Sequence, residues 1–492
     1  MDWVGGADIT TTKFTPMLRP SISRPNFILN SSHSVLYSFP RAFRGSFLIL
    51  NICMITLAKK TKIVCTIGPA TESEPALTEL LKSGMNVMRL NFSHGDFNEH
   101  GNRVINLRSA MKKTGIPAAI LQDLAGPKIR IGTFKTDSVM LVEGMKFTLT
   151  TDAIEGDETK VFVNYPQLPK EVAKGHIIFL HDGKKKLEVL EVKGNNIICK
   201  ILVGGEIKGK RGVNLPDSDL SISSITEKDR ADIAFGLKHD VDFFALSFVR
   251  RPEDITELRG ILNKAKSKAG IIAKIETPQA VNNIDKIIEL ADAIMVARGD
   301  LAIEIPTENV PLVQKMIIKK CNEAGKPVIT ATQMLESMIK SPVPTRAEVS
   351  DVANAILDGT DAIMLSEETT LGDYPVKAVE VMVRVARRVE NDLLHKQLLN
   401  GDRRADAVIS VGQSTTQSAV RTADRVGASY IVSLTESGYS SRMMSRHKPS
   451  QPILVLTPNQ KTFNKSILSF GTNPVLIKRF KDFTEVLKIV RY

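Results

Sequence analysis

Residues 271–300 decide the fold, and they read IIAKIETPQAVNNIDKIIELADAIMVARGD. Two short apolar runs, at 271–276 and 293–299, begin 22 residues apart, and the segment between them has the apolar spacing of an amphipathic helix. A strand, a helix and a second strand in so few residues predict a βαβ unit with parallel strands. Parallel α/β folds bind ligands at the carboxyl ends of their strands. Glu276 and Asp300 both lie at such ends, so we expect their carboxylates to meet.

The same alternation of apolar runs and helical segments extends through most of the chain. Candidate strands lie at 62–68, 87–93, 118–123, 243–248, 271–276, 293–299, 327–332 and 362–368. Most of the intervals between them have helical periodicity, as in EPALTELLKSG and RAEVSDVANAILDG. Eight such β/α repeats are typical of a (β/α)8 TIM barrel. One interval breaks the rhythm, because about 120 residues separate the third strand from the fourth.

This long interval, residues 125–224, alternates apolar and polar residues and contains frequent Gly and Asp. The pattern predicts short antiparallel strands that form a small β-barrel domain. A module inserted above the catalytic end of a barrel is placed to act as a lid. A second α/β pattern occupies residues 396–492. The predicted α/β architecture is therefore a barrel built from 54–124 and 225–395, an inserted β-barrel lid and a C-terminal α/β domain.

Residues 1–53 differ from the rest of the chain, because they are rich in Arg, Ser and Thr and contain only two acidic residues. A translation start assigned too early, with Met54 as the true first residue, is the favoured interpretation. The alternatives are an organelle transit peptide, which has this composition, and a flexible native extension. We expect this segment to be disordered.

The overall composition limits the classes of partner. The chain of 492 residues carries a formal charge of +12, but its basic residues are scattered and aromatic residues make up 5%. No basic run is interleaved with aromatics, which argues against nucleic acid and favours a small anionic substrate. No apolar stretch reaches the roughly 18 residues of a membrane span, so we expect no membrane partner. Four widely spaced cysteines argue against a zinc site or a disulfide framework and favour a reducing, cytoplasmic location.

Polar residues gather at the ends of the predicted strands. They are Arg89, Asn91, Ser93, Asp123, Ser247, Lys274, Glu276, Gly299, Asp300 and Thr332. Two carboxylates suit a hard divalent cation such as Mg²⁺ or Mn²⁺. Lys274 and Arg89 would be repelled by that metal unless an anion lay between them, so the set predicts a bridging phosphate or carboxylate and phosphoryl transfer. Taken alone, a Lys-x-Glu or an RGD is usually a surface feature; the concurrence at six of eight strand ends favours a site.

Seven longer motifs carry a resemblance to a known family. The sequence resembles pyruvate kinases, in the same order, at TKIVCTIGPAT, MNVMRLNFSHG, AGPKIR, KRGVNLP, AKIET, VARGDLAIEIP and ATQMLESM followed by PTRAEVSDVANA. These motifs span residues 59–395, and the similarity is weaker over 396–492. The resemblance implies that phosphoenolpyruvate gives its phosphoryl group to ADP, leaving an enolate that is protonated to pyruvate.

The resemblance also implies the role of each site residue. Glu276 and Asp300 would hold the divalent metal, and Lys274 and Arg89 would contact the transferring phosphoryl group. Thr332 would lie near the face of the enolate that is protonated. The remaining implied contacts are Gly299, Asp300, Thr332 and Ser247 for the substrate, and Asn91, Arg130 and Arg211 for the nucleotide. Position 211 is usually Lys in the family, and Arg keeps the charge but changes the geometry.

The potassium site departs from the family pattern. Potassium-dependent members hold the ion with Asn, Ser, Asp and Thr; Asn91, Ser93 and Asp123 match, but Leu124 stands at the Thr position. Lys128 stands where those members carry Glu. A leucine removes an oxygen ligand, and a lysine can supply the missing charge as a tethered ammonium. We therefore expect activity without potassium; the alternative is that another site binds the ion.

Other departures bear on turns, regulation and assembly. Glu367 occupies a position that is usually Gly, for which we find no account beyond a changed turn. The chain ends where the family's last domain normally continues, so we expect weak or no activation by a sugar phosphate at the loop 434–442. Relatives of this type are usually homotetramers, an assembly that the short end would weaken.

Two other functions remain open on the sequence. One is a metal-dependent lyase or aldolase that makes a pyruvate enolate on the same barrel, since fold alone does not decide chemistry. The other is a truncated effector-binding relative with impaired activity. The inserted domain and Arg130 favour a nucleotide, which a lyase does not need.

Overall fold

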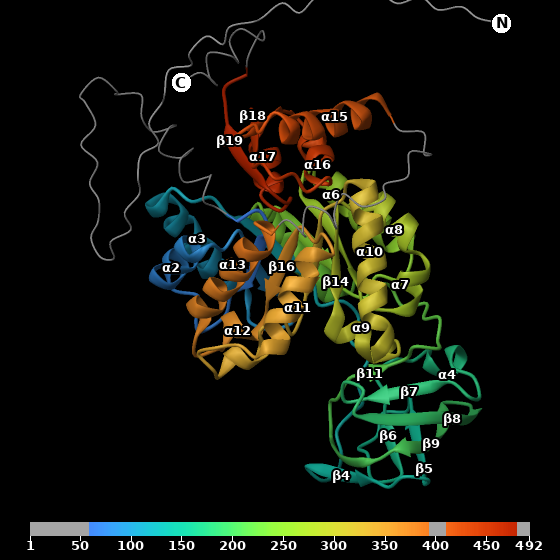
Figure 1. Ribbon diagram of the computed structural model, residues 1–492. Helices are drawn as coiled ribbons and strands as arrows, with labels where there is room; N and C mark the ends of the chain where they lie inside the picture. Colours follow the sequence, from blue (N-terminus) through green and yellow to red (C-terminus); the bar gives the residue numbers. More distant parts are fainter. Residues whose placement is uncertain (1–58, 393–409, 480–492) are drawn as a thin grey trace, which may run out of the picture.

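A closed barrel of eight parallel strands forms the centre of the computed structural model, which describes residues 59–392 and 410–479. The predicted extension at 1–53 lies outside the described residues. A β-sheet domain projects from one end of the barrel and an α/β domain packs on the other (Figure 1). This architecture confirms the predicted fold class, while the limits given above for each domain stay predictions.

The barrel strands lie at the eight predicted apolar runs. They are β1 (Lys62–Thr66), β2 (Val87–Asn91), β3 (Ala119–Asp123), β12 (Phe243–Leu246), β13 (Gly270–Ile275), β14 (Ala293–Ala297), β15 (Val328–Ala331) and β16 (Ala362–Leu365). Each pairs in parallel with the next, and β16 closes the barrel against β1. Their residues are buried almost throughout, because helices cover the outer face and side chains fill the interior.

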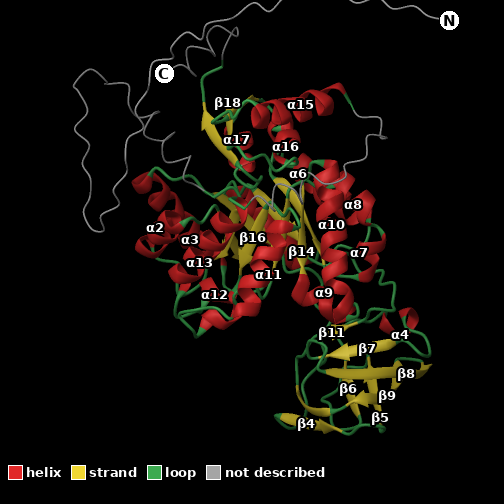
Figure 2. Ribbon diagram, in the orientation of Figure 1, coloured by secondary structure: helices red, strands yellow, loops and turns green. Residues whose placement is uncertain are grey.

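Helices surround the barrel (Figure 2) and begin and end at the expected signals. Ser73 caps the first of them, and Gly84 ends it with a left-handed φ of 118°. The helices are α2 (Glu74–Ser83), α3 (Phe97–Thr114), α5 (Glu227–Lys238), α6 (Pro252–Lys264), α7 (Pro278–Asn282), α8 (Ile284–Leu290), α9 (Arg298–Glu304), α10 (Val310–Ala324), α11 (Arg346–Leu357), α12 (Glu367–Thr370) and α13 (Pro375–Glu390). Short 3-10 helices lie at Thr307–Asn309 and Glu336–Ile339. The helix expected within 271–300 is two helices, α7 and α8, which meet at Asn283.

The domain that leaves the barrel after β3 is built from two sheets, where a small β-barrel of antiparallel strands was predicted, and one strand pair of the larger sheet is parallel. One pairs β4 (Ser138–Leu141) with β10 (Gly205–Lys208). The other has the order β11 (Val213–Asn214), β7 (Ile177–Leu180), β8 (Lys185–Lys193), β9 (Asn196–Val203), β5 (Lys146–Thr150) and β6 (Lys160–Phe162). A one-turn helix, α4 (Leu168–Glu171), precedes β7. Alternate residues of β9 are buried, which explains the alternation in the sequence. We refer to this unit as the lid domain.

The C-terminal domain packs on the amino end of the barrel, opposite the lid domain. Its described part has a parallel sheet of β17 (Ile431–Leu434), β18 (Ile453–Thr457) and β19 (Thr472–Leu476), with helices α15 (Val411–Arg425), α16 (Tyr439–Ser445) and α17 (Gln460–Ser466). Two buried carboxylates join the domains. Asp242, just before β12, accepts from Asn464 Nδ2 at 2.8 Å, and Asp361, just before β16, accepts from the Phe470 N–H at 2.9 Å. The C-terminal domain thus covers the amino end of the barrel, and the lid domain lies at the carboxyl end.

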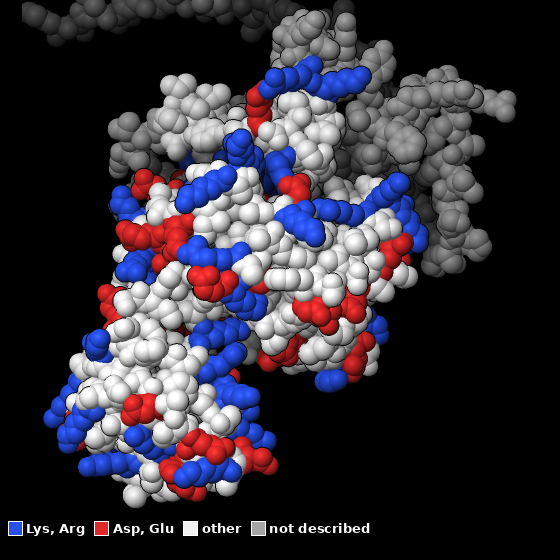
Figure 3. All heavy atoms as spheres, turned by 180° about the vertical axis from the view of Figure 1, so that it is seen from behind, with Lys and Arg blue, Asp and Glu red and all other residues white. Residues whose placement is uncertain are grey.

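Charged groups of both signs are interspersed on the face that Figure 3 shows, where Lys and Arg lie beside Asp and Glu on barrel and lid alike. In the part of the chain that the structure describes, every helix is too short or too polar to cross a membrane.

Candidate active site

A buried carboxylate, Asp123 at the end of β3, joins two cationic side chains. The Arg89 guanidinium, from β2, places Nε 2.7 Å and Nη2 2.6 Å from Asp123 Oδ2. The Lys274 ammonium, from β13, lies 3.3 Å from Asp123 Oδ1. All three strands end at the same rim, so residues far apart in sequence meet there.

Lys274 also contacts a second carboxylate, that of Glu276, which directly follows the same strand. Its Nζ lies 2.8 Å from Glu276 Oε1 and donates to Ser247 Oγ at 2.7 Å. The other Glu276 oxygen accepts from the Phe248 N–H at 2.7 Å. Burial alone would lower the pKa of Lys274, but the charges of Asp123, Glu276 and Asp300 outweigh it and raise that pKa, so the ammonium stays protonated.

Asp300 lies in the first turn of α9, directly after β14. Among residues 59–392 and 410–479, the Asp300 carboxylate has no hydrogen-bond or ion-pair partner. Burial first, and then the Asp300 charge, raise the pKa of the Glu276 carboxyl above its usual range. The Asp300 carboxylate is therefore near enough for its charge to act on Glu276; that the two meet at one metal ion stays a prediction.

Thr332 follows β15 in a strained turn. It has φ of 69° and Gln333 has φ of 52°, which are rare for residues with a Cβ, above all for a β-branched one. The Thr332 hydroxyl accepts from the Gly299 N–H at 2.7 Å and donates to the Ala331 carbonyl at 2.6 Å. The turn thus fixes the Thr332 hydroxyl against the start of α9.

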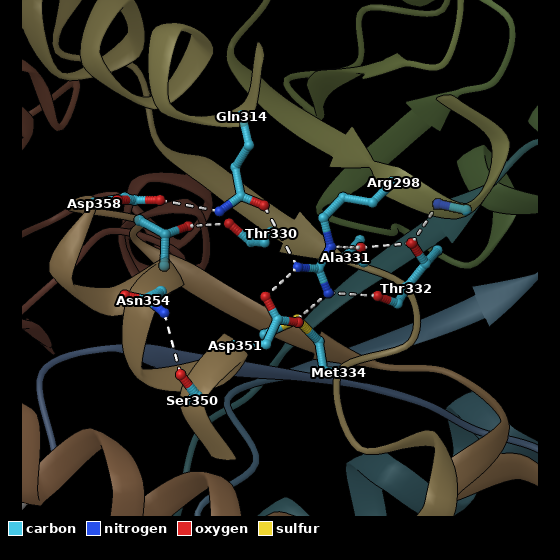
Figure 4. A network of polar contacts seen from close by, with 12 residues as sticks. Arg298, Gln314, Thr330, Ala331, Thr332, Met334, Ser350, Asp351, Asn354 and Asp358 are labelled. Carbon is cyan, nitrogen blue, oxygen red and sulfur yellow. Dashed lines mark hydrogen bonds and ion pairs between the residues drawn. The ribbon is translucent and has the colours of Figure 1, made fainter. Parts of the chain in front are cut away.

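Arg298 holds this turn in place, a role that the sequence did not reveal. Its guanidinium donates to the Ala331 carbonyl at 3.1 Å and to the Thr332 carbonyl at 2.7 Å, and it pairs with Asp351 of α11 at 2.7 Å (Figure 4). The one available signal was the position of Arg298, next to Gly299 at the end of a buried strand. That signal is weak, because an RGD triplet usually lies in a surface turn.

The two arginines expected at the nucleotide lie side by side at the base of the lid domain. The backbone of Arg130 bridges to Gly212, and the Ile131 N–H donates to the Arg211 carbonyl at 3.0 Å. The Arg130 side chain is exposed, and Arg211 Nε is buried without a hydrogen-bond partner among the described residues. Both guanidinium groups are thus available to an anion.

The positions of the potassium pattern differ in chemistry. Asn91 Oδ1 accepts from the Ser93 N–H at 3.1 Å, whereas Leu124 is fully buried and offers an apolar side chain. Lys128 is half-buried above them. Burial, followed by the charges of Arg130 and Lys274, lowers the pKa of Lys128, and the charges of Asp123 and Asp300 oppose this shift only in part. Because the charges of these site residues act on Lys128, its ammonium lies within electrostatic reach of the site.

Glu367, the other departure from the pattern, is exposed at the first position of α12, at the same end of the barrel. Within the described ranges, no three or more His, Cys, Asp or Glu side chains group as a ready metal site. A metal at Glu276 and Asp300 would therefore take its other ligands from water and substrate, as Mg²⁺ usually does.

Comparisons with known proteins identify relatives of the whole described chain. The family model "Pyruvate kinase, barrel domain" matches residues 58–379, and "Pyruvate kinase, alpha/beta domain" matches residues 413–491. A pyruvate kinase of Bacillus licheniformis is 49% identical over 84% of this chain and 71% of its own length. One of Clostridium acetobutylicum is 43% identical over 87% of this chain and 91% of its own length.

A crystal structure of a pyruvate kinase from Cryptosporidium parvum superposes with a TM-score of 0.84, at 38% identity, over 89% of this chain and 90% of that one. The family models together match well over half of the sequence, and the relatives exceed 40% identity over most of it. The chain is a phosphotransferase and belongs to the pyruvate kinase family.

Proposed function

We propose that the chain transfers the phosphoryl group of phosphoenolpyruvate to ADP, giving pyruvate and ATP, at the rim where β2, β3, β13, β14 and β15 end. The observation that supports this most directly is the convergence of two cations, Arg89 and Lys274, on a rim that also carries Glu276 and Asp300. Such a set has opposite charges ready for a phosphoryl group and for a metal that bridges it.

The metal in this proposal is Mg²⁺ or Mn²⁺, held by Glu276 and Asp300. Two features fit a divalent cation: the Asp300 carboxylate has no protein partner among the described residues, and its charge disfavours the ionised form of Glu276. When bound, such a metal would polarise the phosphoryl oxygens and offset developing charge. In the structure the ion-pair partner of Glu276 is Lys274.

Lys274 and Arg89 would bind the phosphoryl oxygens. Their own charges are kept in place by Asp123, whose two oxygens are shared between them. Fixed cations need no reorganisation as negative charge develops, which is how such groups accelerate the reaction. Ser247, bonded to Lys274, would orient the ammonium.

Thr332 and Gly299 would bind the three-carbon part of the substrate. The Gly299 N–H and the Ala331 carbonyl fix the Thr332 hydroxyl, so that it would sit at one face of the enolate. Asn91, Arg130 and Arg211 would contact ADP, since both arginines have unused donors at the base of the lid domain.

We further propose that the enzyme needs no potassium, because Lys128 supplies the monovalent charge. Leu124 removes an oxygen ligand, and the Lys128 ammonium lies within electrostatic reach of Asp123 and Asp300. Replacing tetramethylammonium by potassium at equal ionic strength should change turnover less than about twofold. In the double variant L124T/K128E, which restores the usual oxygen and carboxylate, turnover should become potassium-dependent. Strong activation of the unaltered enzyme by potassium would refute this part.

A coupled assay with phosphoenolpyruvate, ADP and Mg²⁺ tests the reaction. Pyruvate should form only when ADP is present, with one ATP for each pyruvate. A lyase or aldolase would release pyruvate without ADP, and a relative with an impaired site would form none. Omitting each component in turn therefore separates the three functions.

A further inference from the structure

The lid domain touches the barrel on helix α9, the helix that also carries Gly299 and Asp300. Asn214, in the last lid strand, donates from Nδ2 to Glu304 Oε1 at 2.8 Å, and the backbone N–H of the next residue, Leu215, lies near enough to the same carboxylate to lower its pKa. Figure 1 shows β11 beside the end of α9. The contact therefore joins a lid strand to the helix that begins at the active site.

A second contact lies one residue away on α9. A Cβ on Gly183, in the turn between β7 and β8, would lie only 3.4 Å from Ile303 Cγ2, and Gly183 has φ of 80°. Since β7 pairs with β11, the turn and the strand belong to the same edge of the lid sheet. This edge of the lid rests on two consecutive residues at the carboxyl end of α9.

Glu304 and Asp300 project from the same face of α9. They are four residues apart in a helix, which places them on one side and about 6 Å apart along the axis. The charges of Asp300 and Glu276 both act on Glu304. Glu304 thus lies between the lid contact and the two carboxylates proposed to hold the metal.

The environment of Glu304 suits a hydrogen-bond acceptor rather than an ion-pair partner. Burial raises its pKa to about 7, the hydrogen bond from Asn214 opposes this shift, and Asp300 and Glu276 add to it. No Lys or Arg among the described residues forms an ion pair with Glu304, and the largest influences on its pKa include no cation. Its hydrogen-bond partner is a neutral donor from the lid, the Asn214 amide.

Asn214 also lies where a rotation of the lid domain would displace it. It lies three residues after Arg211, a proposed nucleotide contact, and just before the segment that returns to the barrel. That segment has a separate anchor, where Gln279 of α7 donates to the Ser218 carbonyl at 3.0 Å. A rotation of the lid about this return would move Asn214 relative to Glu304 while the Gln279 contact stayed in place.

We propose that Glu304 is a positioning residue: through Asn214 it couples the orientation of the lid domain to the divalent-metal site at the amino end of α9. The inference rests on the role proposed above for Asp300. A coupling between two sites is reciprocal. We call the hydrogen bond between Asn214 and Glu304 the latch. If the latch helps to set the position of α9, then metal binding must also stabilise this hydrogen bond.

Two measurements on the full chain, both without substrate, test this coupling. The first is the Mn²⁺ affinity, measured by calorimetry. The second is hydrogen exchange of the segment 211–218, which contains the Leu215 N–H, with and without Mn²⁺. In the unaltered protein Mn²⁺ should slow this exchange. Asn214→Ala and Glu304→Ala should each weaken Mn²⁺ binding about fivefold or more and abolish the Mn²⁺-dependent protection.

The pattern among variants separates a latch from a general loss of structure. The double variant should be no worse than either single one, because both remove the same bond. Glu304→Gln keeps an oxygen acceptor for the Asn214 amide and should stay within about twofold of the unaltered protein. Gln279→Ala, which cuts the anchor on α7, should leave Mn²⁺ affinity unchanged. If Glu304→Ala fails to fold, Asn214→Ala, at the edge of the lid, carries the test.

Several results would overturn the inference. They are unchanged Mn²⁺ affinity in Asn214→Ala, additive effects of the two alanines, or a Gln variant as impaired as the Ala variant. Asp300→Asn distinguishes this failure from failure of the proposed function. If Asp300→Asn binds Mn²⁺ normally, the metal site itself is wrong; if it loses Mn²⁺ while Asn214→Ala does not, only the latch is wrong.

Discussion

Replacing Asp123 by Asn should destabilise the ligand-free protein, because one buried carboxylate serves two cations. The Asp123 side chain is 2% exposed, those of Arg89 and Lys274 are 10% and 11% exposed, and all three contacts lie between 2.6 and 3.3 Å. Asn has nearly the same shape but no charge. Its one amide oxygen can face either Arg89 or Lys274, and its NH2 group then faces the other cation.

The cost of this change follows from the burial of the group. Removing one member of a buried pair typically costs about 3–5 kcal/mol. At about 2–4 °C for each kcal/mol in a domain of this size, the thermal midpoint should fall by about 6–20 °C. Because a chain of this length tends to unfold irreversibly, variants must be compared at one scan rate by calorimetry.

A matched control uses an exposed pair. Glu79 and Lys82 lie 2.9 Å apart with 57% of each side chain exposed, so Glu79→Gln should leave the midpoint unchanged within error. Turnover of Asp123→Asn should fall as well, since both phosphoryl-binding cations lose their anchor. If Asp123→Asn has the same thermal midpoint as the unaltered protein, the ion pairs of Asp123 do not stabilise the site, and Asp123 does not fix the two cations.

Three further predictions concern single side chains. Lys274→Met should lower kcat about a hundred- to a thousandfold with a smaller change in the KM for phosphoenolpyruvate, as measured by steady-state kinetics; a normal kcat would contradict its proposed role. Arg298→Lys keeps the charge but cannot donate to both the Ala331 and Thr332 carbonyls, so kcat should fall about 10- to 100-fold while the KM for ADP stays constant. Burial lowers the pKa of Lys62 from 10.5 to about 8, so the native state holds fewer protons than the unfolded chain between these values and stability should rise with pH across this window. Lys62→Met should flatten that rise in urea unfolding curves, and an unchanged slope would show that Lys62 does not cause it.

The barrel was predictable because its signals are local and periodic. Each strand is a short apolar run, and each helix repeats its apolar residues at helical spacing, as residues 74–84 and 346–359 show. Parallel order then places all strand ends at one rim, which is why Glu276 and Asp300 were expected together. The resemblance in seven motifs added the chemistry, but the meeting of strand ends follows from topology alone.

The remaining features depend on contacts that no local pattern encodes. Arg298 lies in a familiar motif, but its partners are two carbonyls of a turn some 33 residues later. The positive φ of Thr332 could not be predicted from the residues around it, because tertiary contacts offset the strain. Glu304 looks like an ordinary helix residue, and only the docking of the lid shows that it accepts a hydrogen bond from Asn214.

The charge balance of the site ties the potassium proposal to the rest of the chemistry. Near the rim, Arg89, Lys274 and Lys128 face the carboxylates Asp123, Glu276 and Asp300, so the two signs cancel without any bound ion. A carboxylate at position 128 would leave an excess of negative charge, which an ion from solution would then have to offset. A tethered ammonium is already in place and loses no translational freedom on arrival. It also titrates, and burial together with Arg130 and Lys274 lowers its pKa. Independence from potassium would thus come with sensitivity to alkaline pH, since a neutral Lys128 would leave the carboxylates in excess.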